Sequence, residues 1–274
     1  MDLLNLISSV SLNPFLIGST AAALISIISF KLRLLTKSGA VSSFILGTVV
    51  FSFGQFKWSI PLIAFFLFSN LVSKVGKTYK RKFENIFDKL SQRDSHQVFA
   101  NGSLSGFFVI IYLFYPDEIF YLLYIGSLSA VSADTWATEI GTMRETVTYN
   151  VLTLKKTNQG SSGGVSMSGF LGALLGTIII AFSAIFWIHL NIIYYFCLII
   201  FSGMIGAYID SVLGASVQLQ NKCTICGEIT ERKIHCGQSA NQFSGIKFIT
   251  NDFINFTAAV SGAVTVFFIN VIMN

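Results

Sequence analysis

Eight apolar stretches follow one another along the chain, each close to the roughly 20 residues that a helix needs to cross the hydrocarbon of a bilayer. Within lipid, every backbone N–H and C=O must find a partner inside the protein, which favours helices. The sequence therefore predicts an all-α fold, a polytopic transmembrane helix bundle of about eight spans. The predicted spans are 12–32, 39–55, 58–73, 97–115, 119–138, 165–188, 192–214 and 253–273.

The composition excludes a soluble globular domain. Only 11% of the residues are charged, against about 25% in a typical soluble domain, and the mean hydropathy is +0.69. The net charge of +5 comes from basic residues in segments between the spans, so no nucleic-acid partner is expected. The first basic residues, Lys31 and Arg33, follow the first span, which is the reverse of a secretory signal peptide, so this span is expected to be retained. We predict a single integral membrane domain over residues 1–274.

The basic residues also predict an orientation. Of the 18 Lys and Arg residues, all but Lys57 fall in segments on one side of the predicted bundle. Because positively charged loops stay in the cytoplasm, the sequence predicts that both termini lie outside and that the long loops are cytoplasmic. The expected location is an integral, multi-pass position in the plasma membrane if the source is a prokaryote, with the active site facing the cytoplasm.

Two features of the spans bear on packing. The second and third spans are short and nearly touch, which predicts a helical hairpin or a pair of re-entrant helices. In the sixth span, Gly169, Gly172 and Gly176 lie at spacings that let helix backbones approach closely in lipid, and we interpret them as packing residues.

Two acidic residues near the cytoplasmic ends of spans are the main candidates for catalysis. Asp134 and Asp210 are each followed by a hydroxyl residue, Thr135 or Ser211. An ionisable group at membrane depth costs about 2.5–3.5 kcal/mol on insertion scales, which makes it a functional candidate by default. Two carboxylates at one depth predict an Mg²⁺ site, because this cation prefers oxygen ligands. The alternative is that each acid pairs with a lysine or caps a neighbouring helix.

Other polar residues lie at the cytoplasmic ends of spans. Glu139 follows Asp134 by five residues and would face another side of the helix unless the helix breaks, so it receives a secondary catalytic role. Four residues at the starts of outward-running spans are interpreted either as helix caps or as groups that orient the substrate or metal. These are Asn101, Asn251, Asp252 and Asn255.

The loop from residue 155 to 169 is the best candidate for phosphate binding. Its glycines permit tight turns, and it leads into the N-terminus of the sixth span, where helix amides favour anions. It is not a Walker A loop, because no Gly-Lys-Ser/Thr follows. The predicted phosphate-binding residues here are Lys155, Lys156, Gly160, Gly163, Gly164 and Ser166.

The predicted cytoplasmic loop 217–250 carries a Cys-x-x-Cys and an adjacent His-Cys pair. Cys223, Cys226, His235 and Cys236 offer four soft ligands, which predicts a structural Zn²⁺ that clamps this loop. Free thiols and a redox pair are the alternatives. A catalytic zinc is not expected, because four protein ligands would leave no open position.

Several of these segments together resemble one family of membrane proteins. It is the uncharacterised-domain integral membrane family that includes transmembrane protein 19 and plant phytyl-phosphate kinase. The most specific element is Ala133-Asp-Thr-Trp-Ala-Thr-Glu-Ile-Gly141, and the resemblance runs from about Gly39 to the C-terminus. The other segments that carry it are 97–102, 160–166, 206–218 and 251–255.

The resemblance implies transfer of a phosphoryl group from a nucleoside triphosphate to a phytyl or polyprenyl monophosphate, which gives the diphosphate. Asp134 and Asp210 would hold Mg²⁺, and the partners would be the isoprenoid phosphate, the nucleotide and membrane lipids. The alternatives are a transporter of a lipid or phosphorylated metabolite, a CTP-dependent cytidylyltransferase and a non-catalytic scaffold. A transporter predicts a site near the bilayer midplane, whereas these acids are predicted near the cytoplasmic ends.

Overall fold

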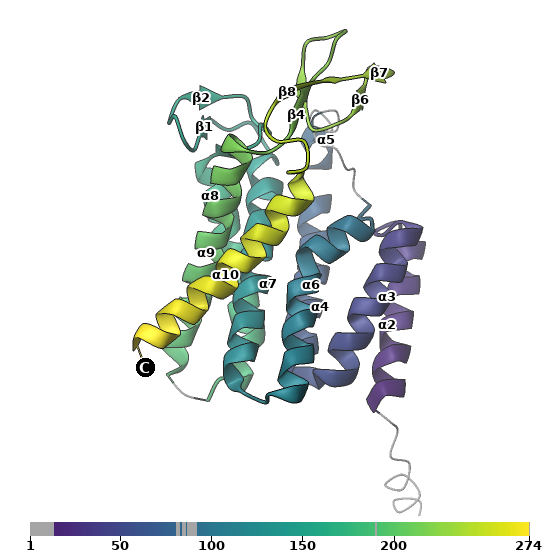
Figure 1. Cartoon of the computed structure of the whole chain (residues 1–274), viewed down its shortest axis with the longest axis vertical. Helices are drawn as coiled ribbons and strands as arrows, with labels where there is room; N and C mark the ends of the chain where they lie inside the picture. Colours follow the sequence, from purple (N-terminus) through teal and green to yellow (C-terminus); the bar gives the residue numbers. More distant parts are fainter. Residues whose placement is uncertain (1–13, 81–82, 84–85, 87–91, 190, 274) are drawn as a thin grey trace, which may run out of the picture.

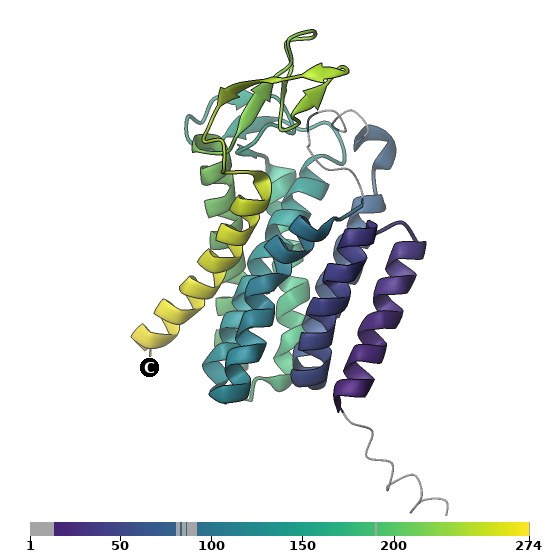
Figure 2. The same ribbon diagram turned by 45° about the vertical axis from the view of Figure 1, so that its right-hand side comes forward.

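The computed structural model describes residues 14–80, 83, 86, 92–189 and 191–273. Long helices lie side by side and form a bundle, and α10 crosses it at a steep angle (Figures 1 and 2). The long helices are α2 (Pro14–Lys31), α3 (Lys37–Phe53), α4 (Gln55–Lys74), α6 (Ser95–Phe114), α7 (Glu118–Gly141), α8 (Met167–Ala184), α9 (Ile192–Ser216) and α10 (Asn251–Met273).

These helices coincide with the predicted spans, so the predicted all-α membrane bundle is confirmed. Six of the described helices are long and apolar enough to cross a membrane; α3, with 17 residues, and α7 are not among them. The start of the first predicted span, residues 12 and 13, lies outside the described residues. α3 and α4 meet at Gly54 and form a tight helical hairpin, one of the two predicted arrangements.

α7 is the central helix of the bundle. Every residue from Tyr121 to Ala133 is buried, and α7 packs against α4, α6, α8, α9 and α10. Its serines bond to three neighbours: Ser127 to Ser105 at 3.0 Å, Ser129 to the carbonyl of residue 199 at 2.9 Å, and Ser132 to the carbonyl of Gly176 at 2.9 Å. In lipid, such hydrogen bonds and small residues hold helices together.

The glycines of α8 let its backbone touch that of α7. A Cβ atom at Gly172 would lie 2.5 Å from the carbonyl oxygen of Trp136, and one at Gly176 would lie 2.7 Å from that of Ser132. These separations are shorter than any normal contact of a Cβ atom, so only glycine permits this crossing. The predicted packing role of these glycines is confirmed.

A polar cap, made of segments 142–166 and 217–250, covers one end of the bundle and contains short strands that the sequence analysis did not predict. Strands of two to four residues are too short to leave a clear period-2 pattern in the sequence. One sheet has the order β2-β1-β3, a second β5-β4-β8, and β6 pairs with β7, all antiparallel. The strands are β1 (Thr148–Asn150), β2 (Lys156–Thr157), β3 (Gly164–Val165), β4 (Gln220–Lys222), β5 (Ile229–Thr230), β6 (Ile234–His235), β7 (Gln238–Ser239) and β8 (Asn241–Ser244).

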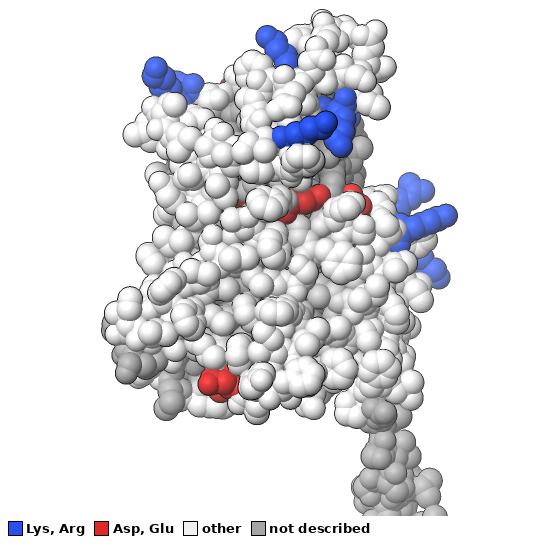
Figure 3. All heavy atoms as spheres, viewed as in Figure 1, with Lys and Arg blue, Asp and Glu red and all other residues white. Residues whose placement is uncertain are grey.

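Charge is distributed unevenly between the two ends of the bundle. On the face in Figure 3, basic residues gather at the cap and the adjoining helix ends, acidic atoms lie at the boundary below the cap, and the middle of the bundle shows no charged residue. The described start of α2 and the C-terminal end of α10 lie at the opposite end (Figure 1). There Lys57 forms an ion pair with Glu118. Three basic residues of the predicted cytoplasmic side, Arg81, Lys82 and Lys89, lie outside the described residues.

Candidate functional site

A cavity of about 1060 Å³ lies where the helix ends meet the cap. This volume is at the upper end of the range for ligand pockets, which suits a large or a double occupant. Segments far apart in the sequence supply its walls: α4, α6, α7, α8, α9, α10 and both parts of the cap. Of the predicted site residues, it brings together Asn101, Asp134, Glu139, Gly160, Gly163, Gly164, Ser166, Asp210, Asn251, Asp252 and Asn255.

Two carboxylates from different helices meet at this cavity. Asp134 of α7 and Asp210 of α9 are half-buried at this cavity, and their carboxyl groups are close enough to interact directly. The side-chain amide of Asn255, oriented as its partners require, donates to Asp210 Oδ2 at 3.3 Å. The carboxylate of Glu231, from the cap, adds negative charge close to Asp210. Two ionised carboxylates in contact repel each other, so this arrangement suits a cation between them.

The depth of this pair distinguishes it from a midplane site. Asp134 lies seven residues before the cap-side end of α7, and Asp210 lies six residues before that of α9. At a rise of 1.5 Å per residue, both lie about 10 Å inside helices that are about 36 Å long. Both acids are therefore in the cap-side third of the bundle.

Asn101 is not a helix cap. The capping residue of α6 is Asp94, which forms a capping box with Gln97, and Asn101 lies one turn further along the helix. Its side-chain oxygen is buried and makes no hydrogen bond within the described part of the chain. A buried acceptor without a donor is costly, which makes Asn101 a candidate for a functional role.

Glu139 keeps its helical conformation, because α7 continues to Gly141; the possible helix break after residue 138 is not present. Despite the five-residue spacing, Glu139 lines the same cavity as Asp134. Its carboxylate forms an ion pair with the ammonium group of Lys80. This pair attaches the segment after α4 to the end of α7.

The glycine-rich loop lies along one wall of the cavity. Gly160 and Gly163 have positive φ angles of 82° and 73°, which other residues rarely adopt. A Cβ atom at Gly163 would lie 2.3 Å from that of Ala215, so the loop can only lie this close to α9 without a side chain there. Ser166 is the N-cap of α8 and accepts a hydrogen bond from the amide of Gly169 at 3.1 Å.

The lysines predicted to bind phosphate are not brought to the cavity. Lys155 and Lys156 are exposed at and beside β2, outside its lining. Among the described residues, three other cations line it instead: Lys80, Arg93 and Lys233. In the sequence these three are indistinguishable from the neighbouring basic residues, because no motif sets them apart.

A second, apolar cavity of about 280 Å³ opens between α2, α3, α4 and α6. We call it the apolar groove. Arg93, Gln97 and Asn101 line both the large cavity and the apolar groove. Gln97 and Asn101 are four residues apart and so share one face of α6. The Arg93 guanidinium lies over the ring of Phe65 at 5.4 Å. Burial lowers the pKa of Arg93, and the charge of Glu139 offsets only part of this effect.

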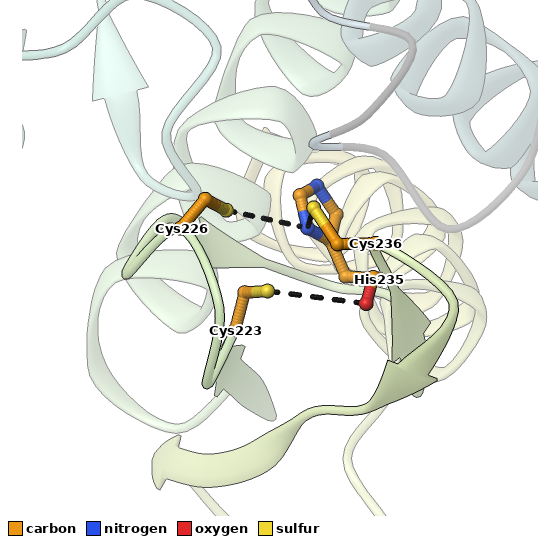
Figure 4. Close-up of side chains that lie close together, drawn as sticks. All are labelled: Cys223, Cys226, His235 and Cys236. Atoms are coloured by element: carbon orange, nitrogen blue, oxygen red, sulfur yellow. Dashed lines mark hydrogen bonds between the residues drawn. The ribbon is translucent and has the colours of Figure 1, made fainter.

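The four predicted zinc ligands also lie together, in the cap and away from the lining of the large cavity. Their ligand atoms are all within 4.8 Å of one another, and Figure 4 shows the side chains converging from two turns. Hydrogen bonds from the backbone at Cys226 are the main cause that lowers the pKa of the Cys223 thiol to about 6, although burial opposes them. The remaining cysteine, Cys197, lies in α9 and is not part of this cluster.

Comparison with known proteins gives a family match over most of the chain. The profile of the family described as "Integral membrane protein DUF92" matches residues 20–263. Protein PGR of Arabidopsis thaliana is 26% identical over 261 residues, which cover 86% of this chain and 89% of that protein. No solved structure matches the chain.

Two further relatives match shorter regions. An uncharacterized membrane protein of Methanocaldococcus jannaschii is 30% identical over 150 residues, which cover 55% of this chain and 61% of that protein. Protein VTE6, chloroplastic, of Arabidopsis thaliana is 25% identical over 153 residues, which cover 54% of this chain and 46% of that protein.

Proposed function

The chain belongs to the DUF92 family of integral membrane proteins, and from this membership and its paired carboxylates we propose that it is a phosphotransferase for an isoprenoid monophosphate. The observation that carries the proposal is the contact between Asp134 and Asp210 in a polar cavity that shares three lining residues with an apolar groove. A substrate with a phosphate at one end and a hydrocarbon chain at the other would match both. The cap would face the cytoplasm, where nucleoside triphosphates are available.

In the proposed reaction, a phosphate oxygen of the isoprenoid monophosphate attacks the terminal phosphorus of a nucleoside triphosphate. A P–O bond forms to the lipid phosphate, and the bond from the terminal phosphorus to its bridging oxygen breaks. The electron pair leaves with the nucleoside diphosphate, and the lipid product is the diphosphate. A phosphate monoester is largely a dianion at neutral pH, since its second pKa is about 6, so no proton has to be removed. The described lining contains no histidine, which suits an acceptor of this kind.

The residues at the carboxylate pair fit Mg²⁺. Asp134 and Asp210 would hold it, since they supply the oxygen ligands that this cation prefers, and the unpaired oxygen of Asn101 lines the same cavity. When bound, Mg²⁺ neutralises charge on the phosphates and orients them.

The chain's own cations would bind the phosphates. Lys80, Arg93 and Lys233 surround the cavity from three segments, and Arg93 lies where the cavity meets the apolar groove. A guanidinium binds phosphate through two parallel hydrogen bonds. We therefore assign Arg93 to the lipid phosphate. Gly160, Gly163 and Gly164 would let the loop approach the nucleotide phosphates, and Asn251, Asp252 and Asn255 would orient the head group.

The test is a transfer assay with purified protein in detergent. The reaction contains Mg²⁺, a panel of nucleoside triphosphates labelled in the terminal phosphate, and phytyl or geranylgeranyl monophosphate. The expected product is labelled lipid diphosphate together with the nucleoside diphosphate. Release of pyrophosphate would indicate a cytidylyltransferase. If folded protein gave no product with any nucleotide or chain length, the proposal would be wrong, and flux into liposomes would test transport.

The apolar groove predicts a chain-length effect. Ile63 lines the groove from α4, and Ile63→Trp is expected to fill it, raising the KM for a long-chain acceptor by about tenfold while changing that for a short-chain acceptor little. Keeping two CH₂ groups of the acceptor out of apolar surroundings costs about 1.6 kcal/mol, roughly that factor. Leu71→Trp is the matched control, because Leu71 is exposed on the same helix and lies outside the groove lining. Equal effects of the two variants on both acceptors would rule out the groove as the site of the hydrocarbon chain.

A further inference from the structure

Two turns of the cap bring together four metal-binding side chains, which lie outside the lining of the large cavity. Cys223 and Cys226 lie in the turn between β4 and β5, His235 is the last residue of β6, and Cys236 begins the turn from β6 to β7. The glycine after each pair, Gly227 or Gly237, has a positive φ angle of 74° or 77°. Each glycine lets the chain reverse directly behind its pair, so that the side chains face each other (Figure 4).

The atoms that face the centre of this cluster are those that bind zinc. His235 Nδ1 lies 3.5 Å from Cys226 Sγ and 3.3 Å from Cys236 Sγ. The amide of Ile225 donates to Cys223 Sγ at 3.4 Å. Such an amide bond stabilises a thiolate, the form in which cysteine binds metals.

The other nitrogen of His235 faces away from the thiols. Nε2 is buried and makes no hydrogen bond within the described part of the chain, and Glu228 Oε2 lies 3.8 Å from it. A histidine that binds a metal through one nitrogen commonly has a carboxylate next to the other, which sets its tautomer and orientation. His235 has this arrangement, with Nδ1 facing the thiols and Glu228 on the side of Nε2.

We propose that Cys223, Cys226, His235 Nδ1 and Cys236 bind one Zn²⁺ with four protein ligands. Three thiolates and one imidazole form a common tetrahedral structural site, and no position remains open for a substrate. The site is therefore structural.

The zinc site would hold in place a segment that lines the large cavity. Glu231 lies between the two ligand pairs and lines that cavity. Its Oε1 accepts from Gln218 Nε2 at 2.6 Å and from Ser162 Oγ at 3.2 Å, which connects both parts of the cap. Metal content can be measured without any catalysis, so the zinc proposal and the proposed reaction can fail independently.

The experiment measures metal content by mass spectrometry on full-length protein purified in detergent. We expect one zinc per chain in the wild type, and at least a tenfold loss in the Cys223→Ser/Cys226→Ser double variant. The matched control is Cys197→Ser, which removes a cysteine of α9 and should keep the zinc. Replacement by Co²⁺ should give the visible spectrum of a tetrahedral thiolate site.

A second measurement does not depend on the folding of a variant. Titration of the wild type with an organomercurial should release zinc as three thiols react, and trypsin should then cut within residues 217–250 faster than before. Wild-type protein that holds no zinc, even after incubation with it, would overturn the proposal. So would the absorption of an iron–sulfur cluster, or zinc that stays bound in the double variant.

Discussion

Replacing Asp134 or Asp210 by asparagine is expected to reduce phosphoryl transfer roughly a thousand-fold. Asparagine keeps the size of the side chain and one oxygen but removes the charge that would hold Mg²⁺. Mutating a residue that hydrogen-bonds to a metal ligand lowers metal affinity or activity about 10–100-fold. Loss of one group that stabilises charge in a transition state lowers kcat about 10²–10³-fold. Loss of a side chain that binds the metal directly should lower the rate at least as much as the larger of these two effects. The measurement is the rate of lipid diphosphate formation at saturating nucleotide, repeated over a range of Mg²⁺ concentrations.

The control for this prediction is Asp117→Asn. Asp117 caps α7 at the end of the bundle opposite the cap, where its side chain accepts from the amide of Ile119, and asparagine caps a helix equally well. This variant should keep full activity. If Asp134→Asn and Asp210→Asn did the same, the assignment of the metal to these two acids would be wrong.

Gly176→Leu is expected to prevent α7 and α8 from packing. The new Cβ atom would lie 2.7 Å from the carbonyl oxygen of Ser132 and 2.9 Å from the ring of Trp136, and Ser132 also donates a hydrogen bond to the carbonyl of residue 176. Overpacking typically costs about 1–3 kcal/mol, and here the obstacle is backbone, which cannot rotate away. We expect a loss of about 3 kcal/mol or more in the free energy of unfolding. The loss is measured as a lower melting temperature: the protein is heated in detergent, and the folded fraction that remains is determined by size-exclusion chromatography.

Leu175→Phe is the matched enlargement on the same helix. Leu175 is 49% exposed, so a larger ring there should change the melting temperature little. A Gly176→Leu variant with the melting temperature of the wild type would show that the crossing of these two helices is looser than described.

The positions of the long helices could be predicted because a bilayer allows few alternatives. A run of about 20 apolar residues has to become a helix once water is excluded, whatever it packs against. The strands of the cap could not be predicted in the same way. β2, β3, β5, β6 and β7 have two residues each, and their pairing depends on turns such as those at Gly227 and Gly237.

The candidate site shows a similar division. Asp134 and Asp210 were identifiable because a carboxylate within an apolar span is costly and therefore conspicuous. The cations of the cavity were not, since Lys80, Arg93 and Lys233 look like any other loop charges until the fold turns them inward. Lys155 and Lys156 were predicted to bind phosphate because they lie next to the glycine-rich loop in the sequence. The fold leaves both outside the lining of the cavity.

The central position of α7 has a consequence for how the protein is made. Fourteen of its 24 residues are buried, and its apolar character is too low to count among the six helices that qualify as spans by themselves. Its hydropathy is low because Asp134, which lines the cavity, and three serines, which bond to neighbouring helices, occupy positions where apolar side chains would otherwise lie. A segment of this kind gains little by leaving the translocon for lipid alone and is stabilised mainly by its neighbours. We therefore expect the insertion of α7 during synthesis to depend on its packing against α4, α6, α8, α9 and α10, the same contacts that bring Asp134 to the cavity.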